Sequence, residues 1–100
     1  MTDKELLELA AKAAGMKWGG DEFYDEHGPL LGWNPLHDDG DALRLAVRLK
    51  IDIDNMTDAC YCEGQFGHDA FVEDGNAGPY ATARRAIVLV AAKIGRGARE

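Results

Sequence analysis

Two cysteines and a histidine are the first residues in this sequence whose types and spacing could support chemistry. Cys60 and Cys62 are one residue apart and His68 follows, and because alternate strand residues share a face, the three could ligate a metal. The one-residue gap is shorter than the usual spacing of zinc ligands, and the sequence has no second cysteine pair. Buried small apolar side chains explain the cysteines better, so we expect no metal and no other cofactor.

Catalysis would need an activated nucleophile or a bound ion, and the sequence offers little for either. It contains no serine, and a dyad of Cys62 and His68 lacks a residue to orient the imidazole and an evident oxyanion loop. His37 and the aspartates of residues 38–41 could hold a divalent ion, but the same aspartates suit the start of a helix. A metal-dependent hydrolase using His37 and Asp39 is therefore the least favoured alternative, and we expect a binding protein.

A pair of arginines stands in the first turn of a predicted helix, where positive charge opposes the helix dipole. Arg84 and Arg85 follow a Gly-Pro pair, and backbone N–H groups at a helix start favour anions, so the pair could contact a phosphate. Two interpretations stay open. The arginines form ion pairs with nearby acids such as Asp74, or they bind a nucleotide whose base stacks on Trp33 or Tyr80.

The distribution of charge is more informative than the net charge of −7. Residues 18–43 and residues 51–83 contain no lysine or arginine, although each segment carries several acidic residues. Either these acids are solvated groups on loops and helix starts, or they form one negative face that repels nucleic acid and attracts a basic partner. We expect a basic protein surface to be bound by Asp21, Glu22, Asp25, Glu26, Asp38 and Asp39.

Helix signals occur at three places in the chain. A capping box at residues 2–5 starts a helix that Gly15 ends. A second helix follows residues 38–41, whose aspartates cap it, and a third spans residues 80–94 with Gly95 as its stop. The three apolar helix faces need a common surface on which to pack.

Short alternating runs predict strands between these helices. They lie at residues 16–18, 51–54, 59–62 and 70–72, with a turn at residues 63–67. Residues 19–33 form a long acidic loop unless Phe23-Tyr24 or Leu30-Leu31 adds a strand. The economical solution is an α+β fold in which three helices pack on the faces of one small, mainly antiparallel sheet.

One hundred residues, of which 46% are hydrophobic, suit a single domain, which we assign to residues 1–95 with a frayed tail at residues 96–100. The chain opens with a helix pattern instead of a secretory signal, and no apolar run reaches the roughly 18 residues of a membrane span. With the cysteines unsuited to a disulfide, we expect a cytoplasmic location. A domain this small gains only modest stability from its core, so self-association into a homo-oligomer would add to its stability.

Several of these segments resemble one family of small phage proteins. Trp33-Asn34-Pro35-Leu36 with residues 38–46 resembles the central motif of the phage α/β/α-sandwich ("ABA sandwich") domain family. Residues 80–95 look like that family's closing helix and residues 9–15 are similar to its opening helix, while residues 55–76 depart most. The resemblance implies a three-layer α/β/α sandwich and a phage setting, hence the cytoplasm of an infected host cell. It implies no activity.

Together these observations predict a small acidic phage accessory protein that binds a host or phage macromolecule and is not an enzyme. A basic channel for nucleic acid in a host defence or replication protein would fit by charge mimicry, without direct contact to nucleic acid or membrane. The alternative is a protein that sequesters a nucleotide at the start of the third helix. One contiguous negative face would favour the macromolecule-binding protein. An arginine-lined pocket would favour the nucleotide-sequestering protein. A cluster of carboxylates and histidine around a metal would favour the hydrolase.

Overall fold

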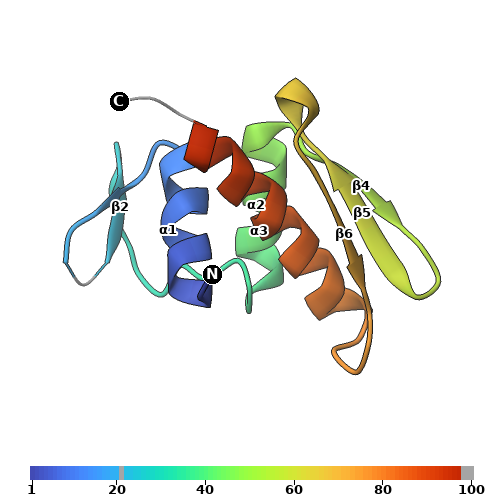
Figure 1. Cartoon of the computed structure of the whole chain (residues 1–100). Coiled ribbons are helices and arrows are strands. Elements are labelled where there is room, and N and C mark those ends of the chain that lie inside the picture. The colour runs from blue at the N-terminus through green and yellow to red at the C-terminus, as the bar shows by residue number, and fades with distance from the viewer. Residues whose placement is uncertain (21, 98–100) are drawn as a thin grey trace.

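Three helices and six short strands make up most of the computed structural model, which describes residues 1–20 and 22–97 (Figure 1). The helices are α1 (Asp3–Ala13), α2 (Asp39–Leu49) and α3 (Pro79–Gly97). The strands are β1 (Lys17–Trp18), β2 (Phe23–Asp25), β3 (Gly28–Leu30), β4 (Asp52–Asn55), β5 (Ala59–Glu63) and β6 (Asp69–Glu73), with a 3₁₀ turn, η1 (Gln65–Gly67), between β5 and β6.

The first two helices begin at the capping residues that the sequence predicts. The Thr2 hydroxyl accepts a hydrogen bond from the Glu5 N–H at 3.2 Å, and the Glu5 carboxylate accepts one from the Thr2 N–H at 3.1 Å. Among the aspartates at the start of α2, Asp38 is the cap, and its side chain accepts a hydrogen bond from the Asp41 N–H at 2.8 Å. The acidic residues here satisfy backbone donors that a helix start leaves free.

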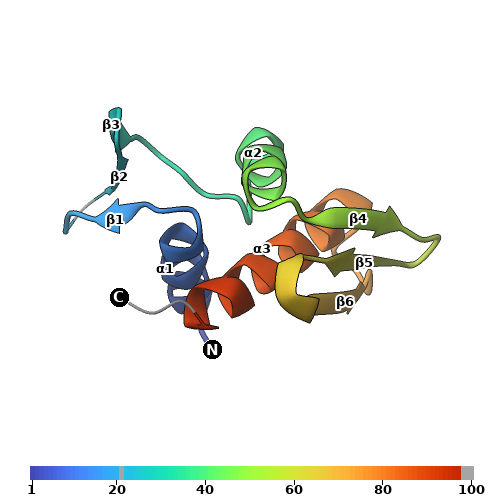
Figure 2. The ribbon, with the colours of Figure 1, turned by 90° about the horizontal axis from the view of Figure 1, so that it is seen from above.

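The strands form two antiparallel sheets, ordered β1-β2-β3 and β4-β5-β6. The α+β class is confirmed, but the expected single sheet is wrong, because the helices separate strands β1–β3 from strands β4–β6 (Figures 1 and 2). The layers therefore run sheet, helices, sheet. The long loop expected at residues 19–33 contains a β2–β3 hairpin, in which Phe23 pairs with Leu30. Its turn is held by the Asp25 carboxylate, which accepts a hydrogen bond from the His27 N–H at 2.7 Å.

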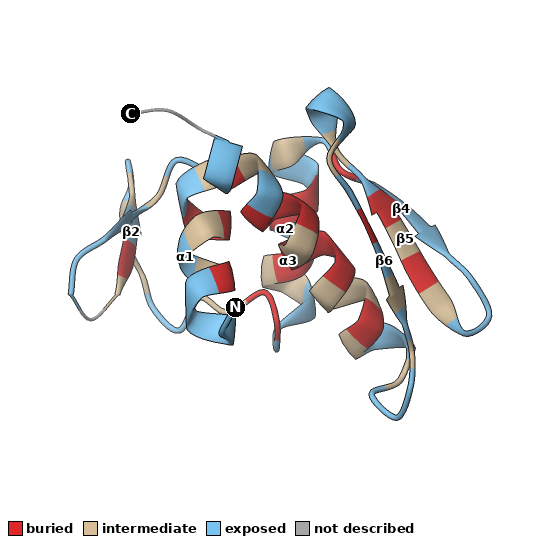
Figure 3. Cartoon of the chain, in the orientation of Figure 1, coloured by how far each residue is buried: buried red, intermediate tan, exposed pale blue. Residues whose placement is uncertain are grey.

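Helix α3 packs against α1, α2 and the β4–β6 sheet, and its buried residues face these neighbours (Figure 3). The prediction that Gly95 stops this helix is wrong, since α3 continues through Arg96 to Gly97. Residues 98–100 of the predicted tail lie outside the described part. Gly95 is buried against α1, and a methyl group on it would overlap the Leu9 carbonyl oxygen. Glycine is required there because the two backbones touch.

Substitution of Gly95 tests this contact. Gly95→Ala should destabilise the protein by about 2 kcal/mol or more, because the added methyl must push α1 and α3 apart. In a domain of this size the melting temperature should fall by roughly 8–16 °C. Gly97→Ala is the matched control, since its methyl would meet only His68 Nε2, at 4.0 Å. That control should melt at or slightly above the parent temperature, and equal melting of both variants would contradict the contact.

Candidate functional site: the outer face of the β4–β6 sheet

The β4–β6 sheet has one face on the core and one toward solvent, because side chains alternate along each strand. Cys60, Cys62 and Ala70 are buried on the inner face, where β5 and β6 pack against α3. The strand register places the alternate residues on the other side. This outer face consists of Asp52, Asp54, Ala59, Tyr61, Glu63, Asp69, Phe71 and Glu73.

Three carboxylates stand in a row across the outer face. Asp52 lies directly opposite Glu63, and Glu63 lies directly opposite Asp69. Directly opposed side chains have Cβ atoms about 4.5–5.5 Å apart, and like charges at that separation destabilise a sheet. Within the part of the chain that the structure describes, no lysine or arginine forms an ion pair with these three carboxylates. Lys93 of α3 reaches this edge but donates to the Asp69 backbone carbonyl.

Aromatic side chains occupy the next row of the same face. Tyr61 pairs with Phe71, whose side chain is 56% exposed, and the Tyr61 hydroxyl donates to the Asp69 carboxylate at 3.2 Å. Partial burial, the hydrogen bond to Asp69 and the charges of Asp69 and Glu63 raise the pKa of the Tyr61 hydroxyl. The face thus combines apolar area with unbalanced negative charge.

The loop that joins β5 to β6 adds an exposed aromatic beside the row of carboxylates. Phe66 is 87% exposed and has a φ of 64°, a left-handed conformation that non-glycine residues seldom adopt. The loop is closed by the Gly64 N–H, which donates to the His68 carbonyl at 2.7 Å. An exposed phenylalanine in a strained backbone makes no contribution to the core and points to a role in contact.

Sequence reasoning recorded the acidic residues of this sheet but assigned them no site. The available signal was alternation: Asp52 and Asp54 flank Ile53, and Asp69 and Phe71 flank Ala70. A period of two places such residues on one face of a strand. The register between the strands could not be known in advance, and register is what brings the three carboxylates into one row.

The acidic residues that sequence reasoning chose for partner binding lie on other elements. Glu22 precedes β2, Asp25 ends it, and Glu26 is exposed in the hairpin turn beside His27. Asp21 lies outside the described residues. Asp38 caps α2, and Asp39 forms an ion pair with Arg84. At least three of these carboxylates (Asp25, Asp38 and Asp39) are therefore engaged within the protein.

Of the four residues predicted to bind a nucleotide, two form ion pairs within the protein, one is exposed and one packs on the core. Arg84 donates to the Leu36 carbonyl at 2.9 Å and to the Asp39 carboxylate at 2.5 Å, so it joins α3 to the start of α2. Arg85 pairs with Asp3 at the start of α1, with 3.3 Å between nitrogen and oxygen. Tyr80 is 74% exposed on the first turn of α3. Trp33 packs on the core near Phe23, with ring centroids 5.2 Å apart.

The two cysteines are buried, as predicted, with their sulfur atoms 3.9 Å apart. Burial raises the pKa of the Cys62 thiol to about 12 and also raises that of Cys60. Protonated thiols are poor nucleophiles and poor metal ligands. Within residues 1–20 and 22–97, no group of three or more histidine, cysteine or acidic side chains could hold a metal ion. His37, the other histidine considered for chemistry, is exposed ahead of α2.

Comparison of this chain with protein-family models, curated proteins and solved structures gives no match. Among the helices of the described residues, none combines the length and apolar character that crossing a membrane requires. An assignment of function therefore depends on the surfaces and pockets themselves. Within the described residues, the outer face of the β4–β6 sheet combines unpaired negative charge with exposed aromatic side chains.

The two arginines at the start of α3 should differ in their effect on stability. Arg84 is only 18% exposed and satisfies the buried Leu36 backbone, so Arg84→Ala should cost about 1–3 kcal/mol. Arg85 is 43% exposed, and Arg85→Ala should change the stability by about 0–1 kcal/mol. Urea unfolding of both variants measures the difference. Equal losses would show that the Arg84 contacts do not join α3 to α2.

The buried cysteines predict a specific response to alkaline pH. The folded state raises the pKa of Cys62 from 9.0 to about 12, so it favours the protonated thiol. The resulting stabilisation is complete below pH 9.0 and is lost as the pH rises toward about 12. Melting temperatures should therefore fall less steeply above pH 9.0 in Cys62→Ala than in the parent. Ellman's reagent should label the native thiols only after unfolding, and rapid labelling of the folded protein would contradict their burial.

Proposed function

We propose that this protein binds a basic protein surface through the outer face of the β4–β6 sheet. The observation that carries the proposal is the row formed by Asp52, Glu63 and Asp69, which stand side by side without a cationic partner among the described residues. Such a row costs stability in the free protein. A partner that brings lysines or arginines to the face relieves this repulsion. The relief of repulsion then contributes favourably to the free energy of binding.

The aromatic side chains of the outer face supply apolar anchors for an interface, which charge alone does not provide. Interface energy is concentrated in a few anchors, among which aromatic residues are enriched, while surrounding charges guide association and exclude wrong partners. Phe71 and Tyr61 lie at the middle of the face, and Phe66 extends from the adjoining loop. Guanidinium groups of the partner can stack on these rings as well as pair with the carboxylates.

A nucleic-acid-binding protein is the partner class that fits this surface best. Its basic channel is built to hold a line of phosphates, and a row of carboxylates presents negative charge in a similar way. In the phage setting expected from the sequence, this role would belong to an infected cell, with a host defence or replication protein as the target. The proposal keeps the acidic mode of binding expected from the sequence and assigns it to different residues.

Charge reversal on the edge strand β4 tests the proposal. The variant Asp52→Lys with Asp54→Lys should fold, because both side chains are exposed, and it should be slightly more stable, by about 0.2–1 kcal/mol, because it places lysine opposite Glu63. The native protein, immobilised, should capture a basic protein from bacterial lysate. The purified partner should bind the β4 variant at least about tenfold more slowly, and its native affinity should fall as salt rises.

The matched control reverses the same number of charges elsewhere. Glu22→Lys with Glu26→Lys alters the β2–β3 hairpin, which sequence reasoning favoured, and should leave the affinity for the same partner within about twofold, because the face itself is unchanged. If the hairpin variant loses binding and the β4 variant retains it, the outer face is not the binding surface. An affinity that is independent of salt would exclude charge pairing as the basis of binding.

A further inference from the structure

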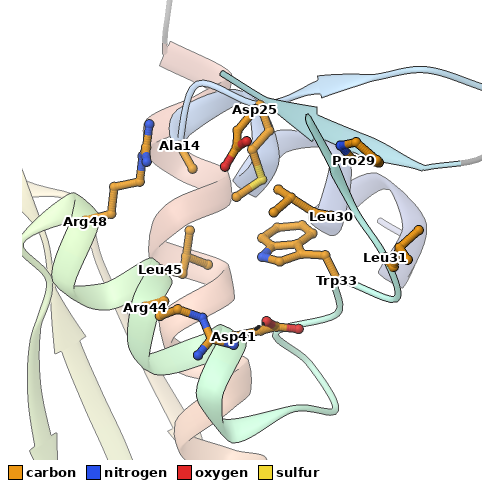
Figure 4. A pocket seen from close by; sticks show the side chains of 11 residues that line it. Ala14, Asp25, Pro29, Leu30, Leu31, Trp33, Asp41, Arg44, Leu45 and Arg48 are labelled. Atoms are coloured by element: carbon orange, nitrogen blue, oxygen red, sulfur yellow. Dashed lines mark hydrogen bonds and ion pairs between the residues drawn. The ribbon is translucent and has the colours of Figure 1, made fainter. Parts of the chain in front are cut away.

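A pocket of about 530 Å³ lies between α2, the end of α1 and the β2–β3 hairpin (Figure 4). Its walls come from segments far apart in the sequence. Arg44, Leu45 and Arg48 line it from α2, and Trp33 and Leu30 line it from the segment before that helix. Asp25 of β2 contributes a carboxylate to the wall, beside Ala14 (Figure 4). This volume lies within the range of pockets that bury small organic ligands.

The two arginines of this pocket differ in their partners. Arg44 forms an ion pair with Asp41 at 2.8 Å, and the second oxygen of Asp41 accepts a hydrogen bond from the Asn34 N–H at 3.0 Å. Arg44 is therefore neutralised within the protein. Arg48 has no hydrogen bond or ion pair within residues 1–20 and 22–97. Figure 4 shows its side chain extended from α2 toward Ala14, on the pocket wall.

The apolar part of the pocket is packed against the core. The Trp33 ring packs edge-on against Phe23, with centroids 5.2 Å apart, and Leu45 on the α2 side is 3% exposed. In Figure 4 the Trp33 ring lies beside Leu30, between the hairpin and α2. Within this one pocket, the Trp33 indole offers a surface to a planar ring, and the unpaired Arg48 guanidinium offers a partner to an anion.

We propose that this pocket binds a nucleoside 5′-monophosphate. The phosphate pairs with the Arg48 guanidinium, which can hold it through two parallel hydrogen bonds. The base lies on Trp33 and the apolar wall. Asp25 accepts hydrogen bonds from the ribose hydroxyls with the oxygen that the His27 N–H does not use. The site is separate from the start of α3, where sequence reasoning placed a nucleotide, and it is independent of the outer face of the β4–β6 sheet.

Adenosine, guanosine, cytidine and uridine 5′-monophosphates are the probes for this site. Trp18 is replaced by phenylalanine in all samples so that fluorescence reports on Trp33, and binding is confirmed by the shift of the Trp33 indole N–H in NMR spectra. At least one nucleotide should quench Trp33 with a dissociation constant below the millimolar range. Arg48→Gln should weaken it at least about tenfold without changing the melting temperature of the free protein, since Arg48 is exposed and unpaired.

Three comparisons decide the outcome. Arg85→Gln, a matched loss of one exposed arginine, should leave nucleotide affinity unchanged, whereas an equal loss in both variants would show nonspecific attraction and overturn the proposal. The nucleoside without phosphate should bind at least about tenfold more weakly, because it leaves Arg48 unpaired. Inorganic phosphate alone should not shift the Trp33 signal. No response of Trp33 to any of the four nucleotides at millimolar concentration would also overturn the proposal.

Discussion

Backbone contact between α1 and α3 holds the helices in place, and it exists because the residues where the helices meet are small. Gly95 lies against the Leu9 backbone, and buried alanines such as Ala10 and Ala91 continue the contact. At this short separation α3 can also reach α2 and the inner face of the β4–β6 sheet. A larger side chain at the crossing would move α3 and disturb all of these contacts together, because packed interiors transmit strain.

The ionic contacts divide the charges of the protein into two groups. Arginines on α2 and α3 pair with carboxylates at helix starts: Arg44 with Asp41, Arg84 with Asp39, and Arg85 with Asp3. The first pair lies within α2, whereas the other two join α3 to the starts of α2 and α1. Among the residues that the structure describes, the acids on the outer face of the β4–β6 sheet form no such ion pair. The net charge of −7 therefore has a structural part and a part available for binding.

Local signals in the sequence predicted local structure well. Thr2 with Glu5 and the aspartate at position 38 marked helix starts correctly, because a cap is made by residues within one turn. Gly95 was misread because a glycine that ends a helix and a glycine that touches another helix look the same in one sequence. The division of strands into two sheets was missed for a related reason, since pairing depends on which helices come between the strands.

The candidate sites depended even more on long-range geometry. From the sequence, Trp33 was assigned to one nucleotide site with Arg84. The fold instead places Trp33 in a pocket with Arg48. Arg48 gave no signal, because an arginine on the exposed stripe of a helix is ordinary. Likewise the acids of β4, β5 and β6 form one surface only through strand register, which no single segment encodes.

The position of α3 in the chain has a consequence for how the protein is made. The ribosome synthesises α1, α2 and all six strands before α3, yet α3 provides the surface on which α1, α2 and the β4–β6 sheet pack. Until α3 emerges, the apolar faces of the earlier elements have nothing to cover them. Folding must then join the first helix to the last, a distant pairing that carries a high entropic cost. We therefore expect the packing of α1, α2 and the β4–β6 sheet to be completed only after α3 has emerged, with the acidic residues helping to keep the nascent chain soluble until then.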